Sequence, residues 1–128
     1  MDDDLSRAWG KRPEKGTYTM YAIAFDLDTA ALAQEYPGNA YNNAYAEIRT
    51  FLTSRGFGWQ QGSVYFGSEG VTPVTAVLAI RDFARTHPWF CTAVVRDIRM
   101  LRIEENNDLT PALVSAAYDR GVQGELPV

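Results

Sequence analysis

The sequence is poor in the residues that build metal centres, disulfides and membrane spans. It has one cysteine, Cys91, and one histidine, His87, in 128 residues, which excludes an internal disulfide and any zinc-binding spacing. No apolar run approaches the ~20 residues of a membrane helix, and no phosphate loop or dinucleotide fingerprint occurs. Residues 2–4 are all aspartate, where a secretory signal would be positive. We therefore expect a cytoplasmic protein with no membrane segment.

A broad basic surface is also lacking, because the formal net charge is −4. Lysine occurs only at Lys11 and Lys15, and the basic residues after Met20 are all arginines: Arg49, Arg55, Arg81, Arg85, Arg96, Arg99, Arg102 and Arg120. Arginine can grip a phosphate with two hydrogen bonds, although genomic base composition explains the same bias. Nucleic acid would therefore bind at a local site.

The chain divides into an extension and one domain. Residues 1–19 are charge-rich, contain Gly10, Pro13 and Gly16 and lack periodicity, which predicts a flexible N-terminal extension. Residues 20–128 are long enough for a single domain with a modest core. A hydrophobic content of 46% and a charged content of 22% are ordinary for a globular protein.

Residues 20–28 read as a β-strand with two different faces. At period two, the bulky residues share one face: Tyr21, Ile23, Phe25 and Leu27. The other face is flat and ends in two acids: Ala22, Ala24, Asp26 and Asp28. A flat face suits close contact with another sheet or subunit, and carboxylates at its rim suit a nuclease site.

Each carboxylate also has a structural interpretation. Asp28 precedes Thr29, where a short helix over residues 29–35 is expected, so Asp28 suits the role of N-cap. Asp26 belongs to the strand itself, and the rest of its face is alanine, which leaves a functional role open.

The remaining pattern alternates between helical and strand periods. It predicts a helix from about Tyr41 to Leu52, a hairpin over 57–66, a helix from Thr72 to His87, a strand over 94–104 and a helix over 109–118. In the helix that begins at Thr72, we expect Val77, Ile80 and Ala84 to point inward. The last helix should be capped by Asp108 and end at Gly121. We expect Cys91 to be a buried residue that fills space in the core, and His87 to mark the end of the second long helix.

The predicted element order is β-α-β-β-α-β with an added C-terminal helix, which is the ferredoxin-like α+β pattern. It implies a four-stranded antiparallel sheet with two main helices on one face and the first strand in the middle. Asp26 would then lie between residues 61–63 on one side and residues 96–97 on the other. The face that carries Ala22 and Ala24 would need cover, and a second copy of the chain is the simplest source.

Four ordered motifs resemble the virulence-associated protein D family of small bacterial proteins. They are residues 20–27 (MYAIAFDL), 41–45 (YNNAY), 59–65 (WQQGSVY) and 95–99 (VRDIR). The resemblance covers Met20 to about Leu113. It implies a ferredoxin-like homodimer, similar to the small CRISPR-associated endoribonucleases, that cleaves RNA as a toxin, in some members with a protein antitoxin. By the same resemblance, Asp26 matches the strand-end aspartate regarded as catalytic.

The mechanism that follows from this resemblance is phosphodiester cleavage. Asp26 would bind Mg²⁺, or positioned groups would drive attack of the ribose 2′-OH without a metal. Arg96 would clamp the phosphate and Ser63 would orient the scissile group. The residues assigned to substrate binding are Gln61, Tyr65 and Arg99. For Tyr65, packing in a strand is the alternative.

A second class of function remains in play, namely a non-catalytic ferredoxin-like dimer that binds a protein or nucleic acid without cutting it. The net charge of −4 favours this module, whereas the convergent polar edge favours the nuclease.

Overall fold

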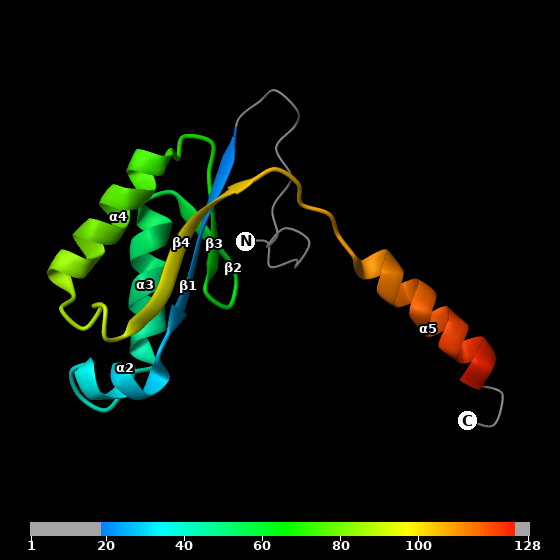
Figure 1. The fold of residues 1–128 in the computed structure, drawn as a ribbon, viewed down its shortest axis with the longest axis horizontal. Coiled ribbons are helices and arrows are strands. Elements are labelled where there is room, and N and C mark those ends of the chain that lie inside the picture. The colour runs from blue at the N-terminus through cyan, green and yellow to red at the C-terminus, as the bar shows by residue number, and fades with distance from the viewer. Residues whose placement is uncertain (1–18, 125–128) are drawn as a thin grey trace.

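A computed structural model of the protein describes residues 19–124. Three helices and four strands form the body of the molecule, and a further helix follows the last strand (Figure 1). In chain order the elements are β1 (Met20–Leu27), α2 (Thr29–Glu35), α3 (Asn43–Ser54), β2 (Phe57–Gln61), β3 (Val64–Gly67), α4 (Pro73–Thr86), β4 (Val95–Ile103) and α5 (Thr110–Gly124).

The four strands form one sheet in the order β2-β3-β1-β4, and each neighbouring pair is antiparallel. Helices α3 and α4 lie side by side on one face of this sheet (Figure 1). The predicted ferredoxin-like fold is therefore confirmed, including the central place of β1. Because β1 is central, its end meets the hairpin between β2 and β3 on one side and the start of β4 on the other.

Local sequence signals set the helix starts. The Asp28 carboxylate accepts a hydrogen bond of 3.0 Å from the Ala31 amide, which confirms its role as the N-cap of α2. Thr72 and Thr75 form a reciprocal capping box at α4, with Pro73 in the first turn. Gly56, which follows α3, has a φ of 93°. Glycine adopts this left-handed conformation at little cost, and the conformation ends the helix.

The core lies between the sheet and helices α3 and α4. Its fully buried large side chains come from every layer: Phe57, Phe83, Ile23, Leu32, Ile48, Leu52 and Val94. Cys91 is half-buried and packs against this core.

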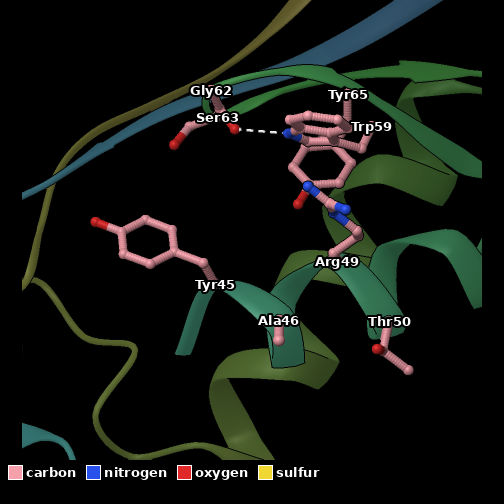
Figure 2. Close-up of a pocket in the computed structure, with 8 residues that line it drawn as sticks. All are labelled: Tyr45, Ala46, Arg49, Thr50, Trp59, Gly62, Ser63 and Tyr65. Atoms are coloured by element: carbon pink, nitrogen blue, oxygen red, sulfur yellow. Dashed lines mark hydrogen bonds between the residues drawn. The ribbon is translucent and has the colours of Figure 1, made fainter. Parts of the chain in front are cut away.

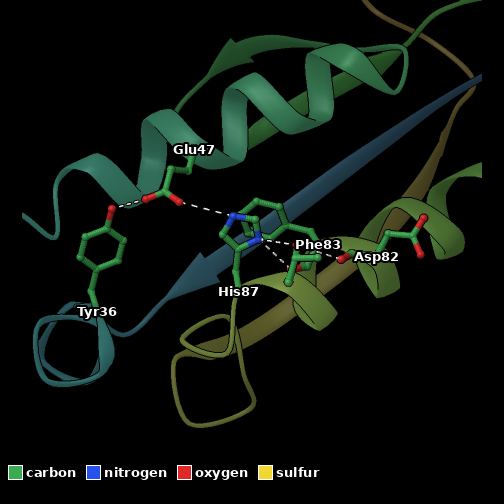
Figure 3. A network of polar contacts seen from close by, with 6 residues as sticks. Tyr36, Glu47, Asp82, Phe83 and His87 are labelled. Carbon is green, nitrogen blue, oxygen red and sulfur yellow. Dashed lines mark hydrogen bonds and ion pairs between the residues drawn. The ribbon is translucent and has the colours of Figure 1, made fainter.

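His87 joins three parts of the fold, as Figure 3 shows. Its ring stacks on Phe83 with centroids 3.9 Å apart, and its Nδ1 lies 2.9 Å from the Phe83 carbonyl oxygen. On its other side, Nε2 lies 3.4 Å from Glu47 Oε1, and Glu47 accepts a hydrogen bond from the Tyr36 hydroxyl. His87 therefore contributes to packing at the end of α4, as its position before Pro88 indicates.

Two predictions about helix faces and ends are wrong. Val77 is exposed, whereas Ile80 and Ala84, which were also predicted to point inward, are partly buried and pack against the core. The buried residues of α4 are Ala76, Ala79 and Phe83. The two alanines let α4 lie close to the core, and Phe83 then enters its aromatic cluster. Helix α5 starts at Thr110, two residues after its capping Asp108, and continues through Gly121, since a single glycine costs a helix only about 1 kcal/mol.

The flat face of β1 also differs from expectation. Ala22 is 0% exposed within the single chain, so a second copy is not needed to bury it. It lies between Phe66 and Leu101 in the sheet register. Ala24 is half-buried.

Helix α5 stands away from the body at the end of an extended segment (Figure 1). Large apolar side chains are exposed on α5 and at Leu109 just before it; those on α5 are Leu113, Val114 and Tyr118. Within residues 19–124, no helix is long and apolar enough to cross a membrane. The predicted extension lies, except for Thr19, outside the described residues.

Candidate functional site

The predicted polar edge is assembled at the end of β1. Asp26 is exposed and lies directly opposite Asp97 of β4 in the sheet register. On the other flank, the amide of Phe25 donates a hydrogen bond of 3.1 Å to the carbonyl oxygen of Ser63. Residues from three distant parts of the sequence thus meet around Asp26, as the topology predicts.

Two β-bulges lie at this same end of the sheet. In the β1–β4 pair, Asp26 faces Asp97 and Leu27 faces Val95, which leaves Arg96 as the extra residue. In the β2–β3 pair, the extra residue is Gln60. A bulge bends a strand and re-aims its side chains, and bulges are common beside active sites. Arg96 is exposed and occupies the bulge, an irregularity that sequence periodicity does not reveal.

The two facing carboxylates differ in their surroundings. Arg99 Nε lies 3.1 and 3.0 Å from Oδ1 and Oδ2 of Asp97. This exposed ion pair draws Asp97 toward Arg99. Arg99 was assigned to substrate binding from the sequence, and in the structure it forms an ion pair with Asp97.

A metal at this edge would take its ligands from few residues. In the described part of the chain, no cluster of three or more histidine, cysteine, aspartate or glutamate side chains is placed to hold a metal ion. Asp26 and Asp97 nevertheless supply carboxylate oxygens, and Mg²⁺ is often held by only one or two carboxylates together with substrate phosphates. The donor chemistry therefore fits this ion.

A hollow opens beside the same edge, on the face of the sheet that carries the helices. Figure 2 shows it between α3 and the β2–β3 hairpin. Its volume is about 500 Å³, within the usual range for ligand pockets. The residues that line it are Tyr45, Ala46, Arg49, Thr50, Trp59, Gly62, Ser63 and Tyr65.

One wall of the hollow is a stacked pair. The guanidinium carbon of Arg49 lies 3.8 Å from the centroid of the Trp59 ring, a cation–π distance. Trp59 is itself held by a hydrogen bond of 2.8 Å from its Nε1 to the carbonyl oxygen of Gly62. Tyr45 extends from α3 and lines another part of the hollow (Figure 2).

The tyrosines of the hollow have perturbed acidity. Burial raises the pKa of Tyr45, and the nearby Tyr41 and Asp26 raise it further. Burial also raises the pKa of Tyr65, and the Arg49 guanidinium partly offsets this rise. Ser63, which lines the hollow, accepts a hydrogen bond from the amide of Phe25 beside Asp26, so the hollow and the carboxylate edge are neighbours.

The sequence-predicted site residues divide into two groups. Asp26, Ser63, Gln61 and Arg96 lie around the end of β1, as expected from the topology. Tyr65 is 3% exposed and stacks on Phe25, so its ring belongs to the core and only part of it reaches the hollow.

Six of the residues that line the hollow were not among the predicted site residues, and three of these, Tyr45, Arg49 and Trp59, form its walls. A signal for two of them exists in the sequence. Tyr45 and Arg49 are four residues apart and so share one side of α3. Their meeting with Trp59 depends on the packing of α3 against β2, which no local pattern specifies.

The fold and the edge together define a class: a ferredoxin-like α+β domain with an exposed carboxylate at the end of its central strand. No known family profile matches the chain, but individual relatives do. Endoribonuclease VapD 2 of Riemerella anatipestifer is 52% identical over 94 residues, which span 73% of this chain and 99% of that relative. The Endoribonuclease VapD homolog of Helicobacter pylori is 50% identical over 96 residues, spanning 73% of this chain and 96% of the relative.

Endoribonuclease VapD of Dichelobacter nodosus is 44% identical over 98 residues, which cover 77% of this chain and all of that relative. The chain belongs to the VapD family. The resemblance inferred from its four motifs is thereby confirmed.

Proposed function

We propose that this protein is an endoribonuclease that cleaves RNA phosphodiester bonds, with Asp26 as its catalytic carboxylate. The observation that carries the proposal is the meeting of Asp26 with Ser63, Arg96 and Asp97 at one exposed edge. The three relatives are all named endoribonucleases, which supports this reaction class. The predicted nuclease is therefore preferred to the non-catalytic module.

Each residue of the edge has a task that its chemistry suits. Arg96 offers a planar set of donors that can hold a phosphate with two hydrogen bonds. The Ser63 hydroxyl can donate to or accept from the scissile group, and the exposed Gln61 can bind the ribose. Asp26 can accept the proton of an attacking hydroxyl, a role that contributes about 10²–10⁴-fold in enzymes.

Mg²⁺ is proposed as the cofactor, held by Asp26 with Asp97 as the second oxygen donor. When bound, the ion would neutralise charge on the phosphate during cleavage. If the ion takes part, EDTA should abolish cleavage and added Mg²⁺ should restore it. Cleavage that is unchanged in EDTA would assign the reaction to the protein side chains alone.

The site assignment is tested with Asp26→Asn. The amide has nearly the same shape as the carboxylate, but it can neither accept a proton at neutral pH nor act as an anionic ligand. We expect cleavage of a labelled RNA to fall by about 100-fold or more, while the circular dichroism spectrum and melting temperature stay unchanged.

Asp28→Asn is the matched control, since it makes the same chemical change two residues away. Asparagine caps helices about as well as aspartate, so this variant should cleave at the wild-type rate. Wild-type cleavage by Asp26→Asn would show that the catalytic residue is elsewhere. RNA binding without cleavage by the wild-type protein would favour the non-catalytic module.

A homodimer is proposed through the face of the sheet opposite α3 and α4. This face carries Leu101, which is 44% exposed, together with the half-buried Ala24, and Asp26 lies at its rim. Stacking two such faces would remove apolar area from water and bring two copies of Asp26 toward one cleft.

Ala24→Glu should split this dimer, because it would bury a charge without a partner. Light scattering at micromolar concentration should give a dimer for the wild-type protein and a monomer for the variant. Val77→Glu, on the outer side of α4, is the control and should remain dimeric. A wild-type monomer would contradict the proposed assembly.

The biological role is proposed as that of a toxin in a toxin–antitoxin or virulence-associated system, acting in the cytoplasm on cellular RNA. Induced expression of the wild-type protein in a bacterial host should then arrest growth, whereas Asp26→Asn should not. A protein antitoxin, if encoded nearby, should relieve the arrest when co-expressed. Growth arrest by Asp26→Asn at equal protein level would separate toxicity from RNA cleavage.

A further inference from the structure

We propose that the hollow between α3 and the β2–β3 hairpin is a base-binding subsite, in which one nucleobase of the RNA stacks between Tyr45 and the Arg49–Trp59 pair. This inference rests on the proposed endoribonuclease function and names the part of the substrate that the protein would hold beside Asp26. Its support comes from the walls of the hollow, its edge and its position.

The walls are flat on two sides. Tyr45 and Arg49 project from successive turns of α3, and Trp59 projects toward them from β2 (Figure 2). The guanidinium carbon of Arg49 already lies 3.8 Å from the centroid of the Trp59 ring, so the two groups together offer a surface on which a base can stack. Aromatic rings and arginine planes are the groups on which proteins stack single-stranded bases.

The edge of the hollow is polar and belongs to the hairpin turn. Ser63 lines it with a hydroxyl, and Gly62 contributes a carbonyl oxygen that already accepts from Trp59 Nε1. A carbonyl oxygen has a second lone pair, so the turn presents both a donor and acceptors to the rim of a base. Trp59 is 38% exposed, which leaves the stacked pair open to an entering ligand.

The position of the hollow connects it to the carboxylate edge. The Ser63 carbonyl oxygen accepts from the amide of Phe25, the residue that precedes Asp26. The Asp26 carboxylate also lies close enough to Tyr45 to raise the pKa of that phenol. A nucleotide whose base occupies the hollow would thus have its phosphate within reach of the end of β1.

The test separates base binding from phosphate binding. The probe is a short single-stranded RNA with 2′-O-methyl riboses, which cannot be cleaved through a 2′-OH, and its comparison is an abasic oligomer of equal length and charge. By isothermal titration calorimetry, the wild-type protein should bind the base-bearing probe more tightly than the abasic one. Tyr45→Leu and Arg49→Gln should each lose roughly 5- to 150-fold in affinity for the base-bearing probe, the range measured for one base–aromatic stack.

Matched controls place the effect in the hollow. Tyr118→Leu on α5 and Arg81→Gln on α4 make the same changes at exposed positions outside it, and both should bind like the wild-type protein. Tyr45→Phe keeps the ring and should restore most of the affinity lost in Tyr45→Leu. Equal melting temperatures would show that all the variants are folded.

The outcomes distinguish this inference from the proposed reaction. Equal affinity for the two probes, or wild-type affinity in Tyr45→Leu, would overturn the base subsite while leaving RNA cleavage to its own test. Base-dependent binding that is lost in Tyr45→Leu would support the subsite even if the wild-type protein cleaved no RNA.

Discussion

Tyr65 has two different environments along a single side chain. Its ring stacks on Phe25 inside the core, with centroids 6.1 Å apart, whereas Arg49 lies close enough to influence its phenol from the hollow. Tyr45 is likewise partly withdrawn from water. In both tyrosines burial disfavours the charged phenolate, and it is the main cause of the raised pKa.

This gives a pH prediction with a definite sign. The folded-state pKa values of Tyr45 and Tyr65 lie above the ordinary 10.0, so folding favours the neutral phenols. Their contribution to stability is fully present below pH about 10 and is lost as the pH rises through the folded values, because the unfolded chain ionises first. The urea concentration at the midpoint of unfolding should therefore fall as the pH is raised from about 9 to about 11.

Replacing Tyr65 with Phe should make that fall shallower, whereas the same change at the exposed Tyr118 should leave it unchanged. If the stability of the Tyr65→Phe protein falls with pH as steeply as that of the wild-type protein, the Tyr65 phenol ionises equally in the folded and unfolded states.

At the scale of elements, the close approach of β3 to the following turn depends on Gly67. A Cβ at this position would lie 2.8 and 2.9 Å from two side-chain carbons of Val71 and 3.1 Å from the Tyr21 carbonyl oxygen. Val71 is buried and is a short, branched side chain, so it cannot swing away.

Gly67→Ala should therefore lower the free energy of unfolding by about 1–3 kcal/mol, the usual cost of overpacking. Gly70→Ala adds the same methyl group where nothing lies within 4 Å, and it should change stability by less than about 0.5 kcal/mol. Denaturant titrations of the two variants measure the difference. Equal midpoints would mean that β3 can move outward at little cost.

Elements whose limits are set by neighbouring residues could be predicted from the sequence. The cap at Asp28, the Thr72-Pro73 start and the stop at Gly56 are all local, and each is observed. The inward face of α4 could be predicted only in part: Ile80 and Ala84 pack against the core as expected, but the exposure of Val77 depends on how the helix packs. The carboxylate edge followed from topology alone, whereas the hollow required the packing of α3 on β2.

At the scale of the whole molecule, a net charge of −4 limits how RNA can bind. With no broad basic surface, few phosphates can be neutralised. Arg49 faces the hollow and Arg96 the carboxylate edge, while Arg99 is already paired with Asp97. Binding should then depend on stacking and hydrogen bonds more than on counterion release.

The logarithm of the RNA affinity should therefore fall only gently with the logarithm of salt concentration, with a slope of about −1 to −2 for two phosphate contacts on a single strand. Arg96→Gln should reduce the steepness by about 0.7. Titrations over a series of salt concentrations measure both values. A slope steeper than about −4 would indicate a long phosphate track that this charge distribution does not provide.

The order of the strands in the sheet has a consequence for synthesis on the ribosome. β1 is central and is made before every other strand, yet its neighbour β4 emerges about 70 residues later. At bacterial and eukaryotic rates of about 5–20 residues per second, this delay is roughly 4 to 14 seconds. Asp26 cannot face Asp97 until then, so a nascent chain would carry its acidic residue without the edge that surrounds it. If this edge is the catalytic site, as proposed, a nascent chain would lack that site until β4 had been translated.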